Sequence, residues 1–359
     1  MQDEEGFSRP SIDMNVCIDC GSCKSVCPAN DSQNDKADAA IGYLLQSLSV
    51  DNVKTSSSGG AFVDIAKAFL DGFDKVAIFG VALDEKLEAK FSCVTSANSI
   101  SLFSGSKYVQ ANIDNSFVRI KEYLRKGYRV VFAGTPCQVD GLKHYLNIDD
   151  DSLLCIDLIC HGVGSPKVFE RYLSSLEQKY NSKIIDYRFT MKRPGWLSKR
   201  VVAQFDNGKE YSRMAITLDD PYMTAYLSHC IMRPSCYSCR YTNLRRTGDI
   251  TIGDAWGVEK RRDYQYYKNG VSLVIPVSEK GQGVIEKCRA ISRIEPIKLS
   301  DYVPTNPQLE KPIDRHPERD ELIRLAVSPT SSFNEFASRL EYRSFIRRCL
   351  SEIKSKLPG

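Results

Sequence analysis

The chain contains thirteen cysteines, and four of them form one short run near the N-terminus. The run is Cys17-x2-Cys20-x2-Cys23-x3-Cys27-Pro28, the spacing of bacterial ferredoxins. Thiolates two residues apart can reach successive corners of a [4Fe-4S] cubane, and the small residues between them let the loop close. A zinc knuckle is the alternative, but zinc sites usually pair their cysteines as two separated doublets. The run therefore predicts iron–sulfur ligation by Cys17, Cys20 and Cys23.

The role of Cys27 stays open at this point. In ferredoxins with two clusters, the fourth cysteine of a run ligates the other cluster, and this chain has a single run. Cys27 is then either the fourth ligand of the same cluster or a cysteine that ligates no cluster. Residues 6–13 and the run together are similar to the middle of a two-cluster ferredoxin domain. We therefore expect a partial ferredoxin-type domain over residues 1–50, with its first half lost or preceding Met1.

A second set of cysteines is spread over three segments. Cys137 lies between a predicted buried strand and a predicted helix, where the helix N-terminus favours a thiolate. Cys160 follows the next predicted strand, and parallel neighbouring strands bring their ends to one sheet edge. Cys236-x2-Cys239 can supply two more thiolates, which predicts a second [4Fe-4S] site.

The alternatives to this second cluster are a four-thiolate zinc site and a set of unrelated buried thiols. Cys230 is the nearest spare cysteine and could replace one ligand. The remaining cysteines stand alone in strand or helix patterns, and we expect them to be buried structural thiols: Cys93, Cys155, Cys230, Cys288 and Cys349.

The elements that position these residues follow from hydrophobic periodicity. Helical faces over 62–69, 117–124, 139–146 and 166–176 alternate with buried strands over 76–81, 129–133 and 153–159. This order indicates an α/β core with parallel strands. A further helix is expected at Ala39–Ser47, and the Ser-rich stretch after it predicts a domain boundary.

After about residue 180 the pattern changes to short strands, predicted over 183–189, 200–205, 210–214, 250–252 and 271–277. An amphipathic helix is expected over Phe333–Lys356. The predicted fold is thus α/β (α+β), a mixed-sheet core with a half-ferredoxin domain and a helical tail. The expected divisions are 1–50, 51–180, 181–305 and 306–359.

Composition narrows the classes of function. The chain has 359 residues and a formal net charge of +4, which is too weak to indicate a nucleic-acid surface. Its apolar runs are far shorter than the roughly 20 residues of a membrane span, so we expect no integral membrane protein. We expect no export signal, since residues 1–13 show neither a basic start nor an apolar stretch after it. Together with the cysteine pattern, this favours a cytoplasmic redox protein.

Four segments together resemble the family formed by the beta subunits of coenzyme F420 hydrogenases and dehydrogenases. They are Ser57–Gly60, Gly105–Tyr108, Gly134–Gln138 with Cys160–Gly162, and Cys236–Gly257, and the resemblance runs from about residue 10 to 290. It implies FAD beside a [4Fe-4S] cluster held by Cys137, Cys160, Cys236 and Cys239. The flavin contacts that it implies are Ser58, Gly59, Gly60, Gly105, Ser106, Lys107 and Tyr108.

The residues themselves are compatible with this implication. Ser58-Gly59-Gly60 opens a predicted helix, whose first N–H groups can face a pyrophosphate. His161 adjoins a ligand cysteine and could shuttle a proton, and Lys192 lies in a loop that either borders the substrate pocket or is simply solvated. His161 and Lys192 are therefore the candidate catalytic residues. Asp249, Asp254 and Trp256 are expected to be structural.

The predicted function is that of an iron–sulfur flavoprotein oxidoreductase with one or two [4Fe-4S] clusters. It would pass electrons between a ferredoxin-type carrier and a hydride acceptor, either coenzyme F420 or another organic acceptor. The resemblance leaves room for another acceptor, since relatives also occur beside bacterial surface-polysaccharide genes. The alternative function is a non-catalytic electron-transfer subunit of a larger redox complex, tied to surface-polysaccharide biosynthesis. A zinc-stabilised binding protein is the third hypothesis.

Overall fold

The computed structural model describes residues 1–30, 39, 41–215 and 219–340. Its centre is an eight-stranded mixed sheet in which β2, β4, β5 and β9 run parallel. Across the sheet the strands follow the order β11 (Ser292–Lys298), β1 (Ile41–Ser47), β10 (Ser272–Pro276), β9 (Ile250–Asp254), β5 (Leu153–Leu158), β4 (Arg129–Gly134), β2 (Val76–Leu83) and β3 (Ala89–Val94).

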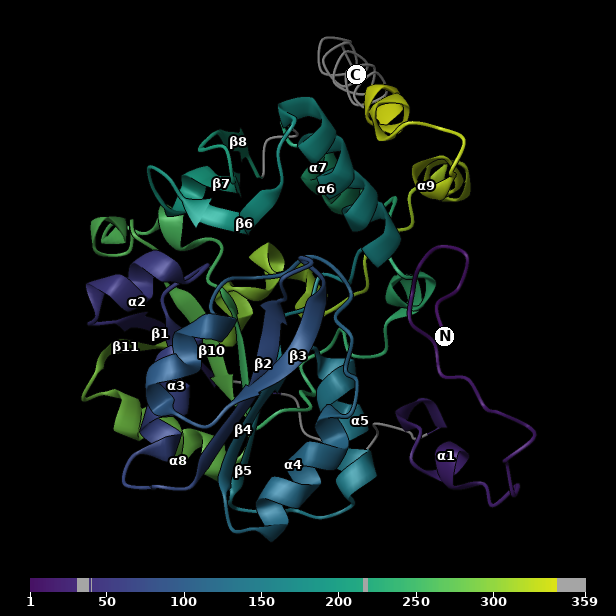
Figure 1. Ribbon diagram of the computed structural model, residues 1–359. Coiled ribbons are helices and arrows are strands. Elements are labelled where there is room, and N and C mark those ends of the chain that lie inside the picture. The colour runs from purple at the N-terminus through teal and green to yellow at the C-terminus, as the bar shows by residue number, and fades with distance from the viewer. Residues whose placement is uncertain (31–38, 40, 216–218, 341–359) are drawn as a thin grey trace, which may run out of the picture.

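Helices cover both faces of this sheet (Figure 1). On one face, α3 (Ala61–Leu70) and α8 (Glu279–Cys288) pack together over Ile78, Val131 and Leu154. On the other face, α4 (Ser116–Arg125) and α5 (Pro136–Leu146) cover Phe79, Val130 and Phe132. Alternate residues of the same strands therefore contribute to two apolar cores, one on each face of the sheet, as in other sheets with helices on both faces.

A second layer contains a three-stranded antiparallel meander and is drawn above the sheet in Figure 1. Its strands are β6 (Ile184–Lys192), β7 (Lys199–Phe205) and β8 (Glu210–Met214). They share an apolar core with α6 (Pro166–Tyr180), α7 (Pro221–Leu227) and α9 (Arg319–Val327). Phe7, from the start of the chain, is fully buried in the same core.

The remaining elements are short. Two are α-helices, α1 (Ser22–Ser25) and α2 (Val50–Thr55). The 3-10 helices are η1 (Pro28–Asn30), η2 (Ala97–Phe103), η3 (Trp196–Ser198), η4 (Pro234–Ser238), η5 (Val258–Lys260), η6 (Tyr264–Tyr266), η7 (Leu299–Asp301), η8 (Val303–Thr305) and η9 (Pro307–Leu309). Among the described residues, no helix has the length and apolar character needed to span a membrane.

The predicted fold class is confirmed, and so are the strands and helices predicted between residues 61 and 180. Ser165 caps α6, since its Oγ accepts a hydrogen bond from the backbone N–H of Val168 at 3.2 Å. β3, β11 and α8 were not predicted. The helix predicted over Phe333–Lys356 is helical over residues 333–340, and its remainder lies outside the described residues.

The helix predicted at Ala39–Ser47 is wrong, because Ile41–Ser47 forms strand β1. β1 lies between β10 and β11, with Tyr43, Leu44 and Leu45 buried in succession. A strand buried on both faces carries a continuous apolar run, so the alternation that normally reveals a strand is missing. β1 also belongs to the central sheet, although it precedes the predicted boundary after residue 50.

Candidate functional site

Two parallel strands bring Cys137 and Cys160 to the same edge of the sheet. β4 ends at Gly134, and Cys137 lies in the first turn of α5, whose N-terminus carries a capping box between Thr135 and Gln138. β5 pairs with β4 in parallel register and ends two residues before Cys160. The carboxyl ends of parallel strands are where α/β folds build their sites, and both cysteines occupy that edge here.

The loop that carries Cys236 and Cys239 is fastened to these strand ends by Arg246. The buried Arg246 guanidinium donates to the carbonyl oxygens of Leu158, at the end of β5, and of Tyr241, in the loop, at 2.8 and 2.9 Å. It also lies 3.5 Å from the buried Asp157 carboxylate. A second link is the Tyr241 hydroxyl, which donates to Asp140 Oδ2 of α5 at 2.8 Å.

These links bring the second set of cysteines around one cavity, which is lined by Cys137, Cys160, Cys236 and Cys239. The four thiols influence one another: burial, and then the nearby Cys236, Cys137 and Cys239, raise the pKa of Cys160 far above its ordinary value. Burial likewise raises the pKa of Cys236 to about 12. Thiols of this kind release their protons when they ligate a metal, so binding here is coupled to proton release.

The backbone at the cavity is adapted to close packing. Gly162, two residues after Cys160, has φ +105°, and an added Cβ would lie 3.3 Å from the Cβ of Cys236. Its N–H donates to Cys160 Sγ at 3.4 Å, and Thr135 Oγ1 lies 3.2 Å from Cys137 Sγ. Four thiols around one cavity fit the donor set of a [4Fe-4S] cluster. No described group of three or more His, Cys, Asp or Glu residues could hold a single metal ion as placed.

The N-terminal cysteines lie outside this cavity. Cys17, Cys20 and Cys23 are exposed and Cys27 is half-buried. Hydrogen bonding with Ser22 lowers the pKa of Cys20. Of the cysteines expected to be structural, the structure buries Cys155, Cys230 and Cys288, whereas Cys93 is half-buried and Cys349 lies outside the described residues.

The Ser58–Gly60 turn lies against the central sheet, directly before α3. The Ser58 hydroxyl donates to Val271 O at 2.6 Å, and the Gly59 N–H donates to Ser272 Oγ at 3.0 Å. Glycine is required at position 59, because an added Cβ would lie 2.3 Å from Leu45 O. Ser58 and Gly59 therefore anchor the turn on β10, while Gly60, with φ +88°, forms the N-cap of α3.

The Gly105–Tyr108 segment lies beside this turn. The Ser106 N–H donates to Ser57 Oγ at 2.7 Å. Lys107 Nζ donates to the carbonyl oxygens of Phe103 and Ser104, both at 3.1 Å. Burial, and then the nearby Arg188 charge, lower the pKa of Lys107 to about 7.

Lys192 reaches the same turn from β6. Its Nζ donates to Ser58 O at 2.6 Å, to Asn269 O at 2.9 Å and to Val53 O. Burial lowers the pKa of Lys192 to about 8. Neither Lys107 nor Lys192 forms an ion pair with a carboxylate of the described residues. The Lys192 amine, which among the described residues is held by carbonyl oxygens alone, thus lies at the turn that opens α3, a site suited to an anionic group.

Sequence reasoning missed the residue that connects this turn region with the cysteine cavity. The Tyr226 hydroxyl donates to Gly162 O at 2.9 Å, and its ring packs edge-on against that of Tyr108 at 4.9 Å. Tyr226 lies in α7, and no motif in the sequence marks it.

His161 has a partner that was also missed. Its Nε2 lies 2.9 Å from Nε2 of His229, whose Nδ1 lies 3.0 Å from Asp314 O. Burial, and then His229, lower the pKa of His161 to about 4, so this imidazole is neutral at pH 7.

A buried polar cluster lies at the end of β9. Lys199 is 1% exposed and pairs with Asp254 at 2.9 Å, and the Trp196 indole N–H donates to the same carboxylate at 3.0 Å. Trp196 stacks on Trp256 with ring centroids 5.1 Å apart. Trp196 is therefore fully buried rather than part of a solvated loop, and Asp254 has the structural role expected for it.

Comparison with known proteins supports the resemblance. Residues 127–301 match the family described as the C terminus of the coenzyme F420 hydrogenase/dehydrogenase beta subunit. This region contains all four core cysteines, whereas the Ser58–Gly60 turn and Lys107 lie outside it. Over this region the chain is similar to the beta subunits of coenzyme F420 hydrogenases and dehydrogenases, the group that the four segments predicted.

Two curated relatives are similar in sequence. The F subunit of the F(420)H(2) dehydrogenase of Methanosarcina mazei is 26% identical over 146 residues, 40% of this chain and 41% of that protein. The chain thus spans less than half the length of this relative. An uncharacterized protein of Methanocaldococcus jannaschii is 25% identical over 289 residues, 75% of this chain and 70% of that protein.

Among solved structures, a chain of the xenon-derivatized F420-reducing [NiFe] hydrogenase complex from Methanosarcina barkeri is 17% identical. The likeness has a TM-score of 0.49 and covers 89% of this chain and 95% of that chain.

Replacing Arg246 by Met should destabilise the chain. The variant leaves the Asp157 carboxylate buried without its cation, and removing one partner of a buried pair costs about 3–5 kcal/mol. Urea unfolding followed by circular dichroism measures the loss. Arg289→Met is the matched control, because Arg289 pairs with Glu286 on the surface, and we expect a change within about 0.5 kcal/mol. Equal stabilities of the two variants would contradict a central role for Arg246.

Lys107→Met should change how stability depends on pH. The Lys107 pKa is about 7 in the folded chain against an ordinary 10.5, so the unfolded chain binds more protons between these values and stability rises with pH there. Below pH 7 the buried charge destabilises the fold fully, and its penalty vanishes as pH approaches 10.5. The variant should therefore gain most over wild type at about pH 7 and least at about pH 10.

Urea unfolding at several pH values tests this expectation. Lys67→Met serves as control, because Lys67 is an exposed residue of α3. Parallel stability curves for wild type and Lys107→Met would show that Lys107 titrates normally.

Proposed function

We propose that this protein is an iron–sulfur flavoprotein oxidoreductase that passes electrons between a one-electron carrier and a hydride-accepting organic substrate. The observation that carries the proposal is the single cavity lined by Cys137, Cys160, Cys236 and Cys239. Three separate segments supply these thiols, and buried side chains hold the segments together. Such convergence is typical of a ligand set rather than of unrelated structural cysteines.

In this proposal, the four thiols of the cavity hold one [4Fe-4S] cluster, and Cys17, Cys20, Cys23 and Cys27 hold a second. FAD binds at the Ser58–Gly60 turn and the Gly105–Tyr108 segment. When bound, the clusters carry single electrons and the flavin exchanges single electrons for a hydride. The contribution of the chain is to fix these sites relative to one another, through Tyr226 between Tyr108 and Gly162.

Lys107 and Lys192 supply positive charge for the flavin site. Both amines are partly desolvated, and an anionic group brought to the turn would favour their charged forms. The α3 N-terminus adds its own partial positive charge. His161 is neutral at pH 7 and can accept or release a proton at Nε2 toward His229, which makes it the candidate for proton handling.

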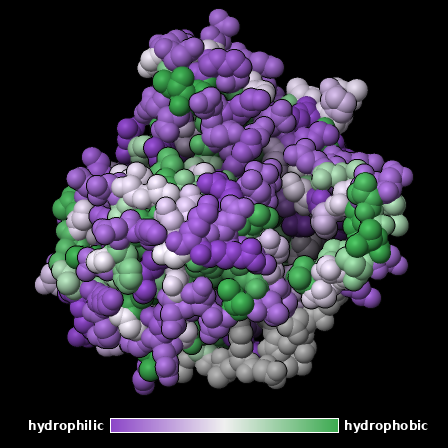
Figure 2. Space-filling view, turned by 60° about the horizontal axis from the view of Figure 1, so that its bottom comes forward, coloured by the Kyte–Doolittle hydropathy of each residue, from purple (hydrophilic) through white to green (hydrophobic). Residues whose placement is uncertain are grey.

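The electron carrier in this proposal is a ferredoxin or another small redox protein. Cys17, Cys20 and Cys23 are exposed, and Met14, Val16 and Ile18 around them are at least 75% exposed. Figure 2 has a hydrophobic strip on its right-hand side, the side on which Figure 1 draws the N-terminal segment. Exposed apolar patches are typical of sites that meet another protein.

Coenzyme F420 is the substrate that the resemblance favours, and another organic hydride acceptor is the alternative. The proposed location is the cytoplasm. A second candidate function is that of a non-catalytic electron-transfer subunit, favoured by the name of the Methanosarcina mazei relative, which is itself one subunit of a larger dehydrogenase. Co-purification of a stoichiometric partner, with no hydride transfer by the isolated chain, would support it.

Anaerobic purification followed by iron, sulfide, zinc and flavin analysis tests the proposal. We expect two [4Fe-4S] clusters and one FAD per chain. Cys160→Ala should lose the iron of the core cluster and Cys20→Ala that of the N-terminal cluster, because each removes a ligand. Cys93→Ala is the control and should keep both clusters, since Cys93 lies outside both sets of ligands.

Each negative result has a definite meaning. Zinc without iron or sulfide would replace the redox proposal by the zinc-stabilised binding protein. Clusters without flavin would exclude the flavoprotein and favour the non-catalytic electron-transfer role. Full iron content in Cys160→Ala would show that the cavity does not hold a cluster.

A further inference from the structure

The first nine residues form a small hairpin that docks on the second layer. Gln2 bridges Ser8 in antiparallel fashion, and the Asp3 carboxylate accepts the N–H groups of Glu5 and Phe7 at 3.1 and 2.9 Å. The Phe7 side chain is fully buried among the residues of α6 and α7. The chain end is therefore an integral part of this core rather than a loose extension.

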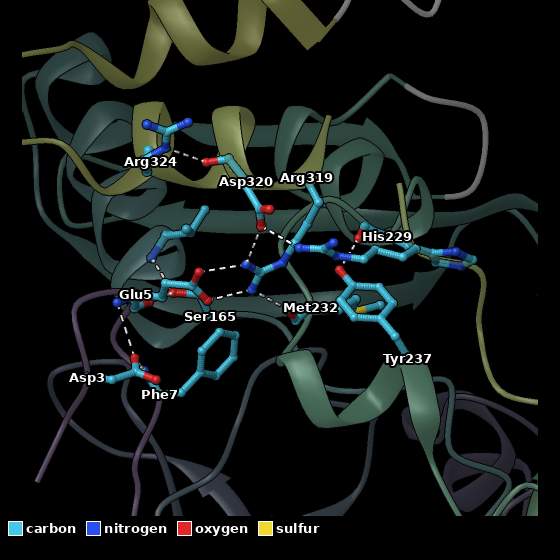
Figure 3. Close-up of polar contacts among 12 residues, drawn as sticks. Asp3, Glu5, Phe7, Ser165, His229, Met232, Tyr237, Arg319, Asp320 and Arg324 are labelled. Carbon is cyan, nitrogen blue, oxygen red and sulfur yellow. Dashed lines mark hydrogen bonds and ion pairs between the residues drawn. The ribbon is translucent and has the colours of Figure 1, made fainter. Parts of the chain in front are cut away.

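Glu5 forms the polar centre of the docking site, as Figure 3 shows. Its two carboxylate oxygens accept from the Arg319 guanidinium at 2.6 and 2.5 Å. Its carbonyl oxygen accepts from Ser165 Oγ, at the start of α6, at 2.5 Å. The Arg319 side chain is only 3% exposed, so this bidentate pair is largely desolvated.

Arg319 also reaches the segment that leads to the core cysteines. Its second guanidinium nitrogen donates to Met232 O at 2.9 Å, and its guanidinium lies over the ring of Tyr237 at 5.9 Å. Tyr237 lies between Cys236 and Cys239. One buried guanidinium thus touches both the N-terminal hairpin and the segment that carries two cysteines of the cavity.

The N-terminal cysteine run has a second anchor at its other end. Arg240, directly after Cys239, donates from Nη1 to Pro28 O at 2.8 Å, and Pro28 directly follows Cys27. The η1 turn that begins at Pro28 also packs against α5, the helix that carries Cys137. The run is therefore held before its first cysteine and after its last one, and both anchors lead to the loop of Cys236 and Cys239.

We propose that Arg319 and Arg240 are positioning residues that hold the N-terminal cysteine run in a fixed place against the core cysteine loop. The inference rests on the proposed function, in which each of the two cysteine sets holds one redox centre. Holding the run in place keeps these two centres at a constant distance. The pair of Arg319 and Glu5 suits this role, because release of the hairpin would leave the buried guanidinium with a single, longer carboxylate contact, to the exposed Asp320 at 3.3 Å.

Hydrogen exchange of the full-length chain, read by mass spectrometry, tests the docking. In Glu5→Gln we expect faster exchange, by about tenfold or more, both in peptides covering residues 1–9 and in peptides covering residues 22–30. In Arg240→Met we expect about fivefold faster exchange in residues 22–30 alone. Arg289→Met is the control, because Arg289 pairs with Glu286 on the exposed surface and has no contact with Arg319, and it should leave both regions unchanged.

Electron paramagnetic resonance of the reduced, cluster-loaded protein gives an independent readout. We expect magnetic interaction between the two reduced clusters in wild type and its weakening in Glu5→Gln. Faster exchange in residues 1–9 alone, with unchanged exchange in 22–30 and unchanged magnetic interaction, would overturn the inference, since the hairpin would then be a separate local structure. Protein without any iron would contradict the proposed function, and the exchange data would still decide the docking.

Discussion

The buried Arg246 guanidinium is the interaction on which the cysteine cavity depends. Two of the four cysteines follow strand ends, and the sheet alone is enough to place them. The other two lie in a loop with little regular structure, whose course must be set by side chains. Arg246 does this by donating to carbonyl oxygens of both the loop and β5 while lying against the Asp157 carboxylate. A planar donor with several N–H groups suits this role, which a lysine could not fill in the same way.

The surroundings of Asp157 explain why this arrangement can be buried. The carboxylate accepts from the Thr247 N–H and hydroxyl at 3.1 and 2.8 Å and from the Gly248 N–H at 3.1 Å. All three hydrogen bonds reach Oδ2, whereas Oδ1 has the Arg246 guanidinium at 3.5 Å and no hydrogen bond among the described residues, so the cost of burial is offset mainly at Oδ2. The Asp157 carboxylate therefore binds Thr247 and Gly248 at the end of the loop and also pairs with Arg246. These contacts connect the loop to β5 beside the cysteine cavity.

The sequence was sufficient to predict local features and insufficient for distant ones. Strands β2, β4 and β5 and their helices follow from short-range periodicity, and Cys137 and Cys160 could be assigned to one sheet edge for that reason. β1 was missed because a strand buried on both faces shows no alternation. Tyr226, His229 and Arg319 act through partners more than 60 residues away, and no local spacing in a single sequence marks such contacts.

Lys107 and Lys192 illustrate a conflict between stability and function. Each amine has carbonyl oxygens as partners, and burial lowers the pKa of both, so each charged form carries a desolvation cost in the folded chain. A chain selected for stability alone would have an apolar residue or a carboxylate partner at these positions. An anionic group at the α3 N-terminus would offset this cost at Lys192, whose amine contacts the turn directly. The desolvated Lys192 amine at this turn is therefore consistent with the proposed binding of an anionic group there, because local violations of packing rules concentrate where proteins bind or react.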